Sequence, residues 1–398
     1  MWAWEELAST YFRTGDVAGV KAVCRRHITA RDRYAGSIGA NIGVNRFFGS
    51  TYTYAIGHIC ILGFYAKLSR LEQRTGLRNR LYIDPDKVVN PSLLSYVQED
   101  FEVTQKNYSP GSEGERFLRL EDPWLMMRSF GEWQYFYDGC IDIETRWEAE
   151  SRGALLQLRH EDIENGRTQL AALGLPRDAW FVALHVRETT LGEVRNAKIL
   201  DYIAAIGEIT RRGGWVIRMG DPTMTRLPQM ENVIDYAHSY IRSDRIDVYL
   251  IGACKFFVGT NSGPLFAPGL FGVPCLQTNF APLMYSVPNS RDIVLPILFR
   301  LRRQERLLSF REILASPLVH AEYPKTIWGD EIEVVPNCSD EIAEAVNEMF
   351  DRLDRARPAS GAASVNQERF LELCAELGLS FRTPVSERFL ARHRDILG

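Results

Sequence analysis

The chain has 398 residues, of which 45% are hydrophobic and 25% are charged. At about 100–200 residues per domain, this length predicts two or three domains, and the composition excludes disordered, collagen-like and disulfide-scaffold classes. The 47 basic and 51 acidic residues leave a net charge of −4. Such a chain has no strong cationic field for nonspecific nucleic-acid binding, although a local basic pocket is compatible with it.

The seven cysteines are scattered, and none forms a C-x-x-C pair. An odd, unpaired set is typical of reduced thiols, so we expect a cytoplasmic protein without a disulfide or zinc framework. The sequence has no apolar run of about 18 residues that would span a membrane. The start of the chain carries early acids and no long apolar core, so we expect no secretory signal.

Residues 2–30 predict two short helices that meet at Gly15-Asp16, with apolar residues at helical spacing on both sides. We expect residues 1–35 to form a helical N-terminal cap. A tetratricopeptide-type hairpin is the alternative, but such repeats stack in arrays and no second hairpin follows.

Strands and helices alternate in the next part of the chain. Residues 35–43 and 81–84 predict strands, and a helix is expected between them from about Ile59 to Arg70. A strand–helix–strand order is typical of a parallel sheet. We therefore expect an N-terminal Rossmann-like domain over residues 36–170, whose last, polar and helical part leads into a second domain.

The alternation is clearest after residue 180. The runs WFVALHVRE, WVIRMGDP, NVIDYAHS, KFFVGTNSG and VPCLQTNFAP predict strands, and helices are expected between them and from Pro264 onward. Five such units predict a doubly wound α/β sheet over residues 171–350. The Pro-, Gly- and Ser-rich stretch 356–364 predicts a flexible linker within residues 351–398, which are expected to end in two helices.

The fold class predicted is therefore α/β, with two facing Rossmann-like, doubly wound domains and helical additions at both ends. Ligands of such proteins bind at the carboxyl ends of the strands. Polar residues that directly follow a strand are for this reason the candidates for function.

The most informative segment is FFVGTNSGPL, at residues 256–265. An apolar strand runs into Gly259, Thr260, Asn261, Ser262 and Gly263, and the proline that follows suits the first turn of a helix. Backbone N–H groups and hydroxyls at the start of a helix form a site for a diphosphate. An ordinary strand–turn–helix corner is the alternative interpretation.

Two other strand ends carry candidate contacts to the donor. Alternation in VALHVRE places His185 and Arg187 on one face, and an arginine there suits bidentate phosphate binding, with a surface ion pair to Glu188 as the alternative. In WVIRMGDP, Arg218 is a candidate to neutralise phosphate and Asp221 to bond a ribose hydroxyl. Gly-Asp-Pro is also common turn chemistry.

Two histidines complete the candidate set. His238 is predicted beside the base or ribose, with a capped loop histidine as the alternative. His58 follows Gly57 at the start of a predicted helix, where the helix dipole disfavours the protonated imidazole and so suits a general base. A structural histidine at the helix start is the alternative.

The sequence also contains the acidic turn Asp84-Pro85-Asp86. A D-x-D pair can hold a divalent metal on a nucleotide diphosphate, but Asp-Pro-Asp is equally a plain turn. We predict that no metal is required.

The segments HVRE, GGWVIRMGDP and FFVGTNSGPLFAPGLFGVP look like a bacterial glycosyltransferase family found among surface-polysaccharide genes, over roughly residues 45–350. The segment that begins at Thr260 resembles the Ser-Gly-Pro-Met-His segment of heptosyltransferases, which holds the nucleotide diphosphate. The His-Val-Arg run is similar to the phosphate-binding arginine motif of O-fucosyltransferases. Two departures are clear: Leu265-Phe266 replaces Met-His, and Gly57-His58 stands where heptosyltransferases have Gly-Asp.

The resemblance implies a GT-B architecture with the acceptor in the N-terminal domain and the nucleotide-sugar donor in the C-terminal one. It implies a sugar transfer to a glycan, lipid-linked or protein acceptor, without nucleic acid and with at most peripheral membrane contact. Arg187, Thr260 and Ser262 would stabilise the leaving diphosphate, and His58 would deprotonate the acceptor.

Three other functions remain open from the sequence. The first is a nucleotide-sugar 2-epimerase on the same fold, and the second is a non-catalytic nucleotide-binding scaffold. The third is a metal-dependent transferase that uses Asp84 and Asp86. A retaining transferase would instead use a carboxylate nucleophile such as Glu188 or Asp221.

Overall fold

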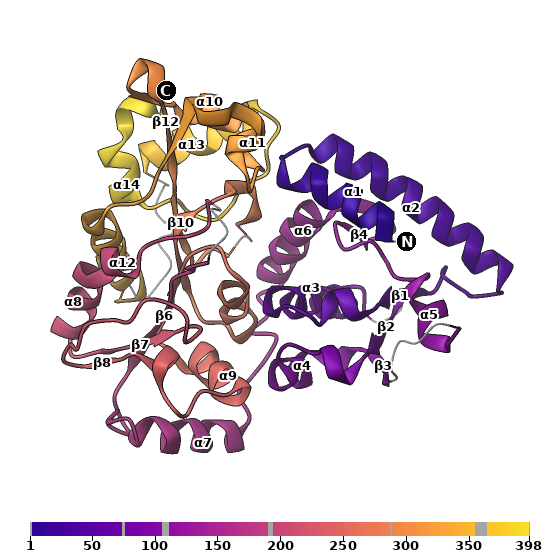
Figure 1. Cartoon of the computed structure of the whole chain (residues 1–398), viewed down its shortest axis with the longest axis horizontal. Helices are drawn as coiled ribbons and strands as arrows, with labels where there is room; N and C mark the ends of the chain where they lie inside the picture. The colour runs from indigo at the N-terminus through magenta and orange to yellow at the C-terminus, as the bar shows by residue number, and fades with distance from the viewer. Residues whose placement is uncertain are drawn as a thin grey trace. The chain divides into compact units, whose positions relative to one another are not determined.

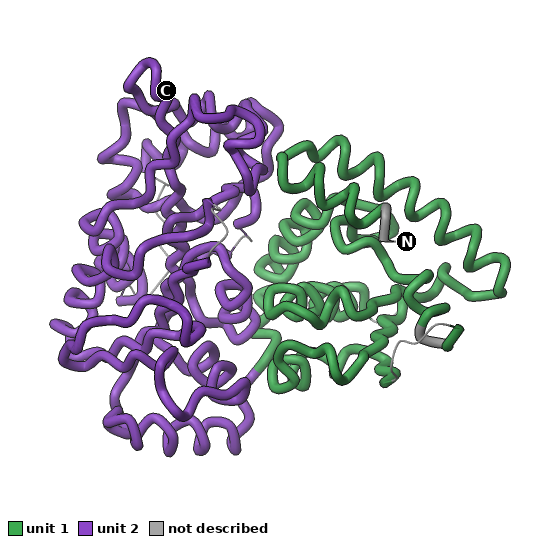
Figure 2. Tube along the Cα trace, viewed as in Figure 1, with its two compact units in different colours: residues 1–156 green, residues 157–398 purple. Residues whose placement is uncertain are grey.

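The computed structural model describes residues 2–73, 76–105, 111–189, 194–286, 289–354 and 364–397. The chain forms two compact units, residues 1–156 and 157–398 (Figure 2). Among the helices in these ranges, none combines the length and hydropathy needed to cross a lipid bilayer.

Unit 1 begins with a helical hairpin of α1 (Trp2–Arg13) and α2 (Val17–Ser37) (Figure 1). The chain turns at Gly15, whose φ of 76° is left-handed, and Asp16 caps α2 by accepting a hydrogen bond from the Gly19 N–H. The predicted pair of helices is confirmed.

The strand expected over residues 35–43 is wrong. Helix α2 continues to Ser37 because Ala35 is buried against Phe47 and Leu120. The chain then turns at Gly39, which is left-handed, and the Ala40 N–H donates back to the Ala35 carbonyl. The first strand starts only after this turn.

A three-stranded parallel sheet forms the centre of unit 1. Its strands are β1 (Asn45–Phe48), β2 (Arg78–Ile83) and β3 (Glu102–Gln105), in the order β1-β2-β3. Helix α3 (Ile56–Leu71) connects β1 to β2, and its residues from Ile59 to Ser69 are all buried, which explains its nearly continuous apolar sequence. The predicted strand–helix–strand order is confirmed, but its first strand lies at residues 45–48 instead of 35–43, and the helix starts three residues earlier than predicted.

The remaining elements of unit 1 pack around this sheet and α3. Helix α6 contacts α3, where Lys67 and Glu144 form a buried ion pair of 2.6 Å. The elements are α4 (Pro91–Val97), α5 (Glu113–Leu118), the antiparallel pair β4 (Met126–Ser129) and β5 (Glu132–Tyr135), and α6 (Phe136–Ala149).

Unit 2 contains a six-stranded parallel sheet in the order β11-β10-β9-β6-β7-β8. Numbered by appearance in the chain, this is the Rossmann order 3-2-1-4-5-6, and its direction reverses between β6 and β9. The strands are β6 (Phe181–His185), β7 (Trp215–Met219), β8 (Val233–Ile234), β9 (Phe257–Gly259), β10 (Cys275–Phe280) and β11 (Ile293–Pro296).

Helices cover both faces of this sheet (Figure 1). Helices α8 and α12 contact each other on one face, and α9 lies on the other with α7. The strands they cover are almost entirely buried and therefore read as short apolar runs. These helices are α7 (His160–Ala171), α8 (Ile203–Arg211), α9 (Asp244–Ala253) and α12 (Ser339–Asp354).

The helix expected from Pro264 is wrong. The chain forms two 3₁₀ turns there, Gly263–Phe266 and Pro268–Phe271. Pro268 has no N–H to bond the carbonyl of Pro264 four residues earlier, so an α-helix cannot continue. The helix dipole expected behind the glycine turn is consequently absent.

The C-terminal part of unit 2 adds a small antiparallel sheet and four helices. The predicted linker lies, except for Ser364, outside the described residues, and the two predicted terminal helices are confirmed as α13 and α14. The added elements are β12 (Leu298–Leu301), β13 (Arg306–Leu307), β14 (Ile332–Val335), α10 (Phe310–Leu314), α11 (Pro324–Trp328), α13 (Val365–Glu376) and α14 (Glu387–Arg392).

The predicted α/β fold class is confirmed, with two compact units that each hold a parallel sheet. The second unit has the doubly wound Rossmann order, whereas the first has three parallel strands. The N-terminal hairpin belongs to unit 1 and the C-terminal helices to unit 2.

Candidate functional site

The carboxyl ends of β6 and β9 lie side by side where the strand order of unit 2 reverses. His185 and Gly259, the last residues of these strands, are register partners, and the Thr260 N–H donates to the His185 carbonyl over 3.2 Å. Doubly wound sheets bind ligands at this position. The structure thus brings the His185–Arg187 and Gly259–Gly263 candidates together.

A buried hydrogen bond joins the two strand ends. The Ser262 hydroxyl oxygen lies 2.9 Å from Nδ1 of His185, and both side chains are buried. Burial, together with the charges of Arg218 and Arg187, lowers the pKa of His185 to about 4. The imidazole is therefore neutral at pH 7, and the pair fixes the turn against β6 without a charge.

The other two polar side chains of the turn also bond within the protein. The Thr260 hydroxyl accepts from the Arg187 backbone N–H over 3.0 Å, and the Asn261 side-chain amide donates to the Ala281 carbonyl over 2.9 Å. Thr260, Asn261 and Ser262 are all buried. Their side chains therefore hold the turn between β6 and the end of β10.

The backbone of the same turn is differently placed. Over the ranges that the structure describes, the N–H groups of Asn261, Ser262 and Gly263 donate to no protein acceptor. Buried backbone N–H groups are almost always paired, and a run of such donors is suited to an anion. The groups available to a phosphate are hence these backbone N–H groups rather than the buried hydroxyls.

Arg187 stands at the end of β6, two residues beyond His185. Its backbone is held on both sides, because its N–H donates to Thr260 and its carbonyl accepts from the Ala197 N–H over 3.0 Å. Its side chain is partly exposed. The residue therefore lies beside the turn that carries the N–H run, and its charge helps to lower the pKa of His185.

Arg218 lies inside unit 2 at the end of β7, where it is fully buried. Its Nη1 is 3.2 Å from Asp235 and its Nη2 is 3.8 Å from Glu188. Asp235 in turn lies 2.8 Å from Nδ1 of His238. These four residues form a polar cluster that joins the ends of β6, β7 and β8.

His238 is held on both ring nitrogens. Its Nε2 lies 3.1 Å from the carbonyl oxygens of Pro222 and Met224, and because carbonyls only accept, Nε2 carries a proton. This is the geometry of the alternative interpretation, a capped loop histidine. The predicted contacts of Arg218 and His238 with a donor stay predictions.

Asp221 forms a local turn. One carboxylate oxygen accepts from the Thr223 N–H over 2.9 Å and from its hydroxyl over 2.7 Å, and these bonds hold the pKa of Asp221 below its ordinary value. Gly220 before it has a left-handed φ of 152°. A ribose contact at Asp221 stays a prediction.

A polar cluster at the end of β10 escaped the sequence analysis. The Tyr202 hydroxyl lies 2.7 Å from the Thr278 hydroxyl. The Asn279 side-chain amide donates to the same Tyr202 hydroxyl over 3.1 Å. Asn279 and Asn337 exchange two backbone-to-side-chain bonds, and Asn279 has a left-handed φ of 46°. The polar residues Gln277, Thr278 and Asn279 within the otherwise apolar strand CLQTNF could have indicated this cluster.

His58 lies in unit 1, at the third residue of α3. Its Nδ1 is 2.6 Å from the Thr51 carbonyl oxygen, which only accepts, so Nδ1 carries the proton and Nε2 is the basic nitrogen. Burial lowers the pKa of His58, which keeps the ring neutral at pH 7. The imidazole can therefore act as a base through Nε2.

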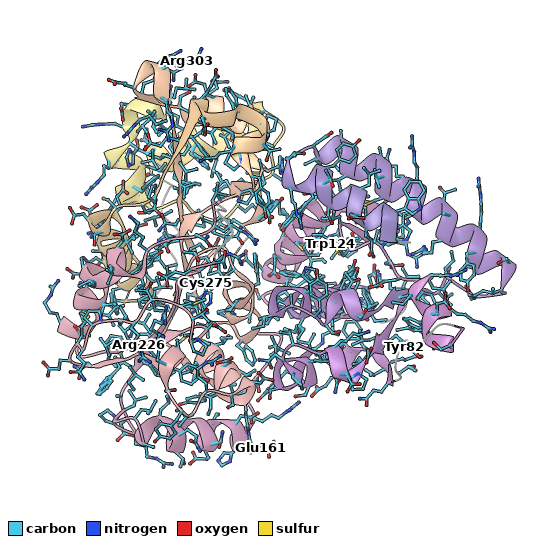
Figure 3. The ribbon with its side chains drawn as sticks, in the orientation of Figure 1. Tyr82, Trp124, Glu161, Arg226, Cys275 and Arg303 are labelled. Carbon is cyan, nitrogen blue, oxygen red and sulfur yellow. The ribbon has the colours of Figure 1, made fainter. Side chains whose placement is uncertain are left out.

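Two aromatic rings bracket the His58 imidazole. The ring centroids of Tyr54 and Trp124 lie 4.7 Å and 5.2 Å from that of His58, and Trp124 is labelled in Figure 3. Tyr54 is 57% exposed. One side of the histidine is thus covered by a ring that itself faces solvent.

Glu121 is an acid near this histidine that sequence reasoning missed. Its carboxyl is buried and accepts from the Gly49 N–H over 3.0 Å. Burial and the nearby Glu5 raise the pKa of Glu121 to about 8. Glutamate side chains are ordinarily exposed, so nothing in the sequence around Glu121 indicates that its carboxyl is buried.

The acidic turn Asp84–Asp86 contains a salt bridge. Lys87 Nζ lies 2.9 Å from the buried Asp84 carboxylate. In the parts of the chain with described coordinates, no three or more His, Cys, Asp or Glu side chains gather as a metal site would need. The predicted independence from metal stays a prediction.

No protein-family model matches the sequence, and no curated protein matches it. Among solved structures, the chain is similar to a glycosyl transferase of family 9 from Veillonella parvula, at 12% identity and a TM-score of 0.42, over 64% of this chain and 87% of that one. It is similar to the ADP-heptose LPS heptosyltransferase II of E. coli, at 11% identity and a TM-score of 0.39. That similarity covers 63% of this chain and 90% of the E. coli chain.

It is also similar to the E. coli heptosyltransferase WaaC with ADP-2-deoxy-2-fluoro heptose. That similarity has 11% identity and a TM-score of 0.34, over 76% of this chain and 99% of that one.

Proposed function

We propose that the protein is a glycosyltransferase that uses a nucleotide-sugar donor. The observation that supports this most is the run of N–H groups at Asn261, Ser262 and Gly263, which find no acceptor among the described residues and stand at the switch point of a Rossmann-ordered sheet. With Arg187 beside it, this run suits a diphosphate.

In the proposed reaction the acceptor oxygen forms a bond to the anomeric carbon while the bond from that carbon to the diphosphate breaks. Negative charge then develops on the diphosphate. The N–H run and Arg187 stabilise this charge, and each charge-assisted hydrogen bond contributes about 1.5–3 kcal/mol.

The proton of the acceptor hydroxyl goes to Nε2 of His58. Two features support this assignment: the Thr51 carbonyl holds the proton on Nδ1, which leaves Nε2 basic, and the lowered pKa of His58 keeps the ring neutral. The predicted roles of Thr260 and Ser262 change accordingly: their hydroxyls hold the turn, and its backbone meets the phosphate.

The proposed acceptor is a hydroxyl of a glycan, a lipid-linked sugar or a protein. We propose that the nucleotide-sugar is the co-substrate, that no metal is needed and that the reaction takes place in the cytoplasm. Nucleic acid is not a proposed partner, because the net charge of −4 gives no broad attraction to phosphate backbones.

The test is to incubate the full chain with a panel of UDP-, GDP-, ADP- and CMP-sugars, with and without a mixture of glycan acceptors and with and without EDTA. The proposal predicts release of one nucleotide that depends on acceptor and continues in EDTA. Conversion of the donor sugar without release would identify an epimerase. Binding without turnover would indicate a scaffold, and loss of activity in EDTA would indicate a metal-dependent enzyme.

A further inference from the structure

The segment of residues 121–124 lies against the turn between β1 and α3. The Asp122 N–H donates to the Phe47 carbonyl over 2.9 Å, and the Tyr52 hydroxyl donates to the Asp122 carbonyl over 3.1 Å. The segment is therefore fixed to the strand before the turn and to the turn itself. It ends in Trp124, which contacts the His58 ring.

Within this segment, the Glu121 carboxyl holds the backbone of the turn. It accepts from the Gly49 N–H over 3.0 Å. A Cβ on Gly49 would lie only 2.8 Å from a Glu121 oxygen, so this approach requires glycine at that position. The turn and the carboxyl are fitted closely to each other.

The same turn sets the protonation of His58. The Thr51 carbonyl accepts from Nδ1, and a small rotation of this peptide would remove the bond, because hydrogen bonds weaken steeply with angle. The carboxyl of Glu121 thus acts on His58 through the backbone of the Gly49–Thr51 turn. Two contacts from residues 121–124, the carboxyl behind the turn and the Trp124 ring, converge on one imidazole.

We propose that Glu121 is a positioning residue for His58, which holds the Gly49–Thr51 turn so that the imidazole keeps its basic nitrogen at Nε2. This inference rests on the proposed function for its catalytic meaning, because His58 is the proposed base. The positional claim itself concerns the tautomer and can be measured without substrate.

The test is ¹⁵N NMR of the histidine rings in the full chain, labelled at histidine and measured at pH 7. His58→Gln identifies the signals of His58. The proposal predicts that wild-type His58 carries its proton on Nδ1. It predicts that Glu121→Ala and Gly49→Ala each shift His58 to a mixture of both tautomers.

Two variants serve as controls. Glu121→Gln keeps an acceptor for the Gly49 N–H and is expected to keep the wild-type tautomer, because the pKa of about 8 leaves the Glu121 carboxyl largely uncharged at pH 7 as well. Glu144→Gln removes a buried carboxyl that pairs with Lys67 elsewhere in unit 1. It is expected to destabilise the unit while leaving the His58 signals unchanged.

Activity provides a second readout once an acceptor is known. Glu121→Ala is expected to lower kcat by about tenfold to a hundredfold, less than the roughly 10²- to 10⁴-fold contribution of a general base, because the base itself stays in place. The KM for the donor is expected to stay within about twofold, because ground-state donor binding does not involve this bond. Glu121→Gln is expected to restore most of kcat.

A wild-type His58 with its proton on Nε2 would overturn the proposal, as would an unchanged tautomer in both folded variants, Glu121→Ala and Gly49→Ala. If Glu121→Ala does not fold, Gly49→Ala alone decides, because the proposal predicts a tautomer shift in that variant. A tautomer shift in a protein that transfers no sugar would refute the proposed function alone.

Discussion

The hydroxyl of Ser262 lies 2.9 Å from Nδ1 of His185, and this bond crosses the point where the strand order of the unit 2 sheet reverses. It ties the turn after β9 to the end of β6. The N–H groups of Asn261, Ser262 and Gly263 are carried on this turn, so the bond fixes the part of the protein that we propose meets the diphosphate.

Removal of the Ser262 hydroxyl is expected to destabilise the protein and weaken nucleotide binding. In Ser262→Ala a nitrogen of the buried His185 loses its partner, which costs about 1–3 kcal/mol of unfolding free energy. Urea denaturation measures this change. Ser37→Ala, whose hydroxyl is exposed in unit 1, is the control and should change stability by about 0.5 kcal/mol or less. Equal stabilities of Ser262→Ala and the wild type would contradict the proposed role of the Ser262–His185 bond.

The pKa of His185 predicts a dependence of stability on pH. Its value of about 4 in the folded protein lies below the ordinary 6.5, so as pH falls the unfolded chain takes up the proton first. The contribution to stability is complete above pH 6.5 and is lost as pH falls toward 4. The slope is at most about 1.4 kcal/mol per pH unit for one proton.

Chemical denaturation between pH 4.5 and 7.5 checks this expectation for unit 2. His185→Gln should have a flatter dependence than the wild type. His27 of unit 1 has a similarly lowered pKa of about 4, so His27→Gln should flatten the transition of unit 1 instead. Identical pH profiles for wild type and His185→Gln would show that the ring does not titrate as described.

Arg187 is expected to matter for transfer rather than for folding. Arg187→Ala removes one charged donor to the leaving diphosphate, which should lower the rate by roughly tenfold to a thousandfold. The measurement is initial rate of nucleotide release at saturating acceptor. The control is Arg303→Ala, a largely exposed arginine on the surface of the same unit. Full activity of Arg187→Ala would remove it from the donor site.

Protonation of His58 is expected to cause the fall of kcat/KM at acid pH. Because burial lowers its pKa, the base form should persist below pH 6.5, and kcat/KM should fall only beneath that value. His58→Gln should lower the rate by about 10²- to 10⁴-fold and abolish this acid limb. A variant with wild-type rates across the pH range would exclude His58 as the base.

The sheet of unit 2 was largely predictable because parallel strands covered on both faces read as short apolar runs. The alternation of these runs with helices identified the doubly wound order and placed the turn after Val258-Gly259 at a strand end. The strand expected over residues 35–43 failed because burial of Ala35 against Phe47 and Leu120 extends helix α2.

The details of the site depended on contacts distant in sequence. Alternation along β9 does not continue into the turn, so it gave no sign that the hydroxyls of Thr260 and Ser262 point inward. Their partners, Arg187 and His185, lie 73 and 77 residues away. Glu121 bonds Gly49 across 72 residues, and no local pattern marks a glutamate for burial.

A donor site in unit 2 is best tested by the thermal stability of the chain in the presence of UDP, GDP, ADP, CMP and their sugars, with and without EDTA. A ligand that binds the folded state at about 100 times its dissociation constant adds about 2.7 kcal/mol of stability, which is a shift of several degrees in Tm. A donor site in unit 2 predicts such a shift for one nucleoside diphosphate, insensitive to EDTA and smaller in Arg187→Ala, which loses one charge-assisted hydrogen bond. No shift with any nucleotide would contradict a donor site in unit 2.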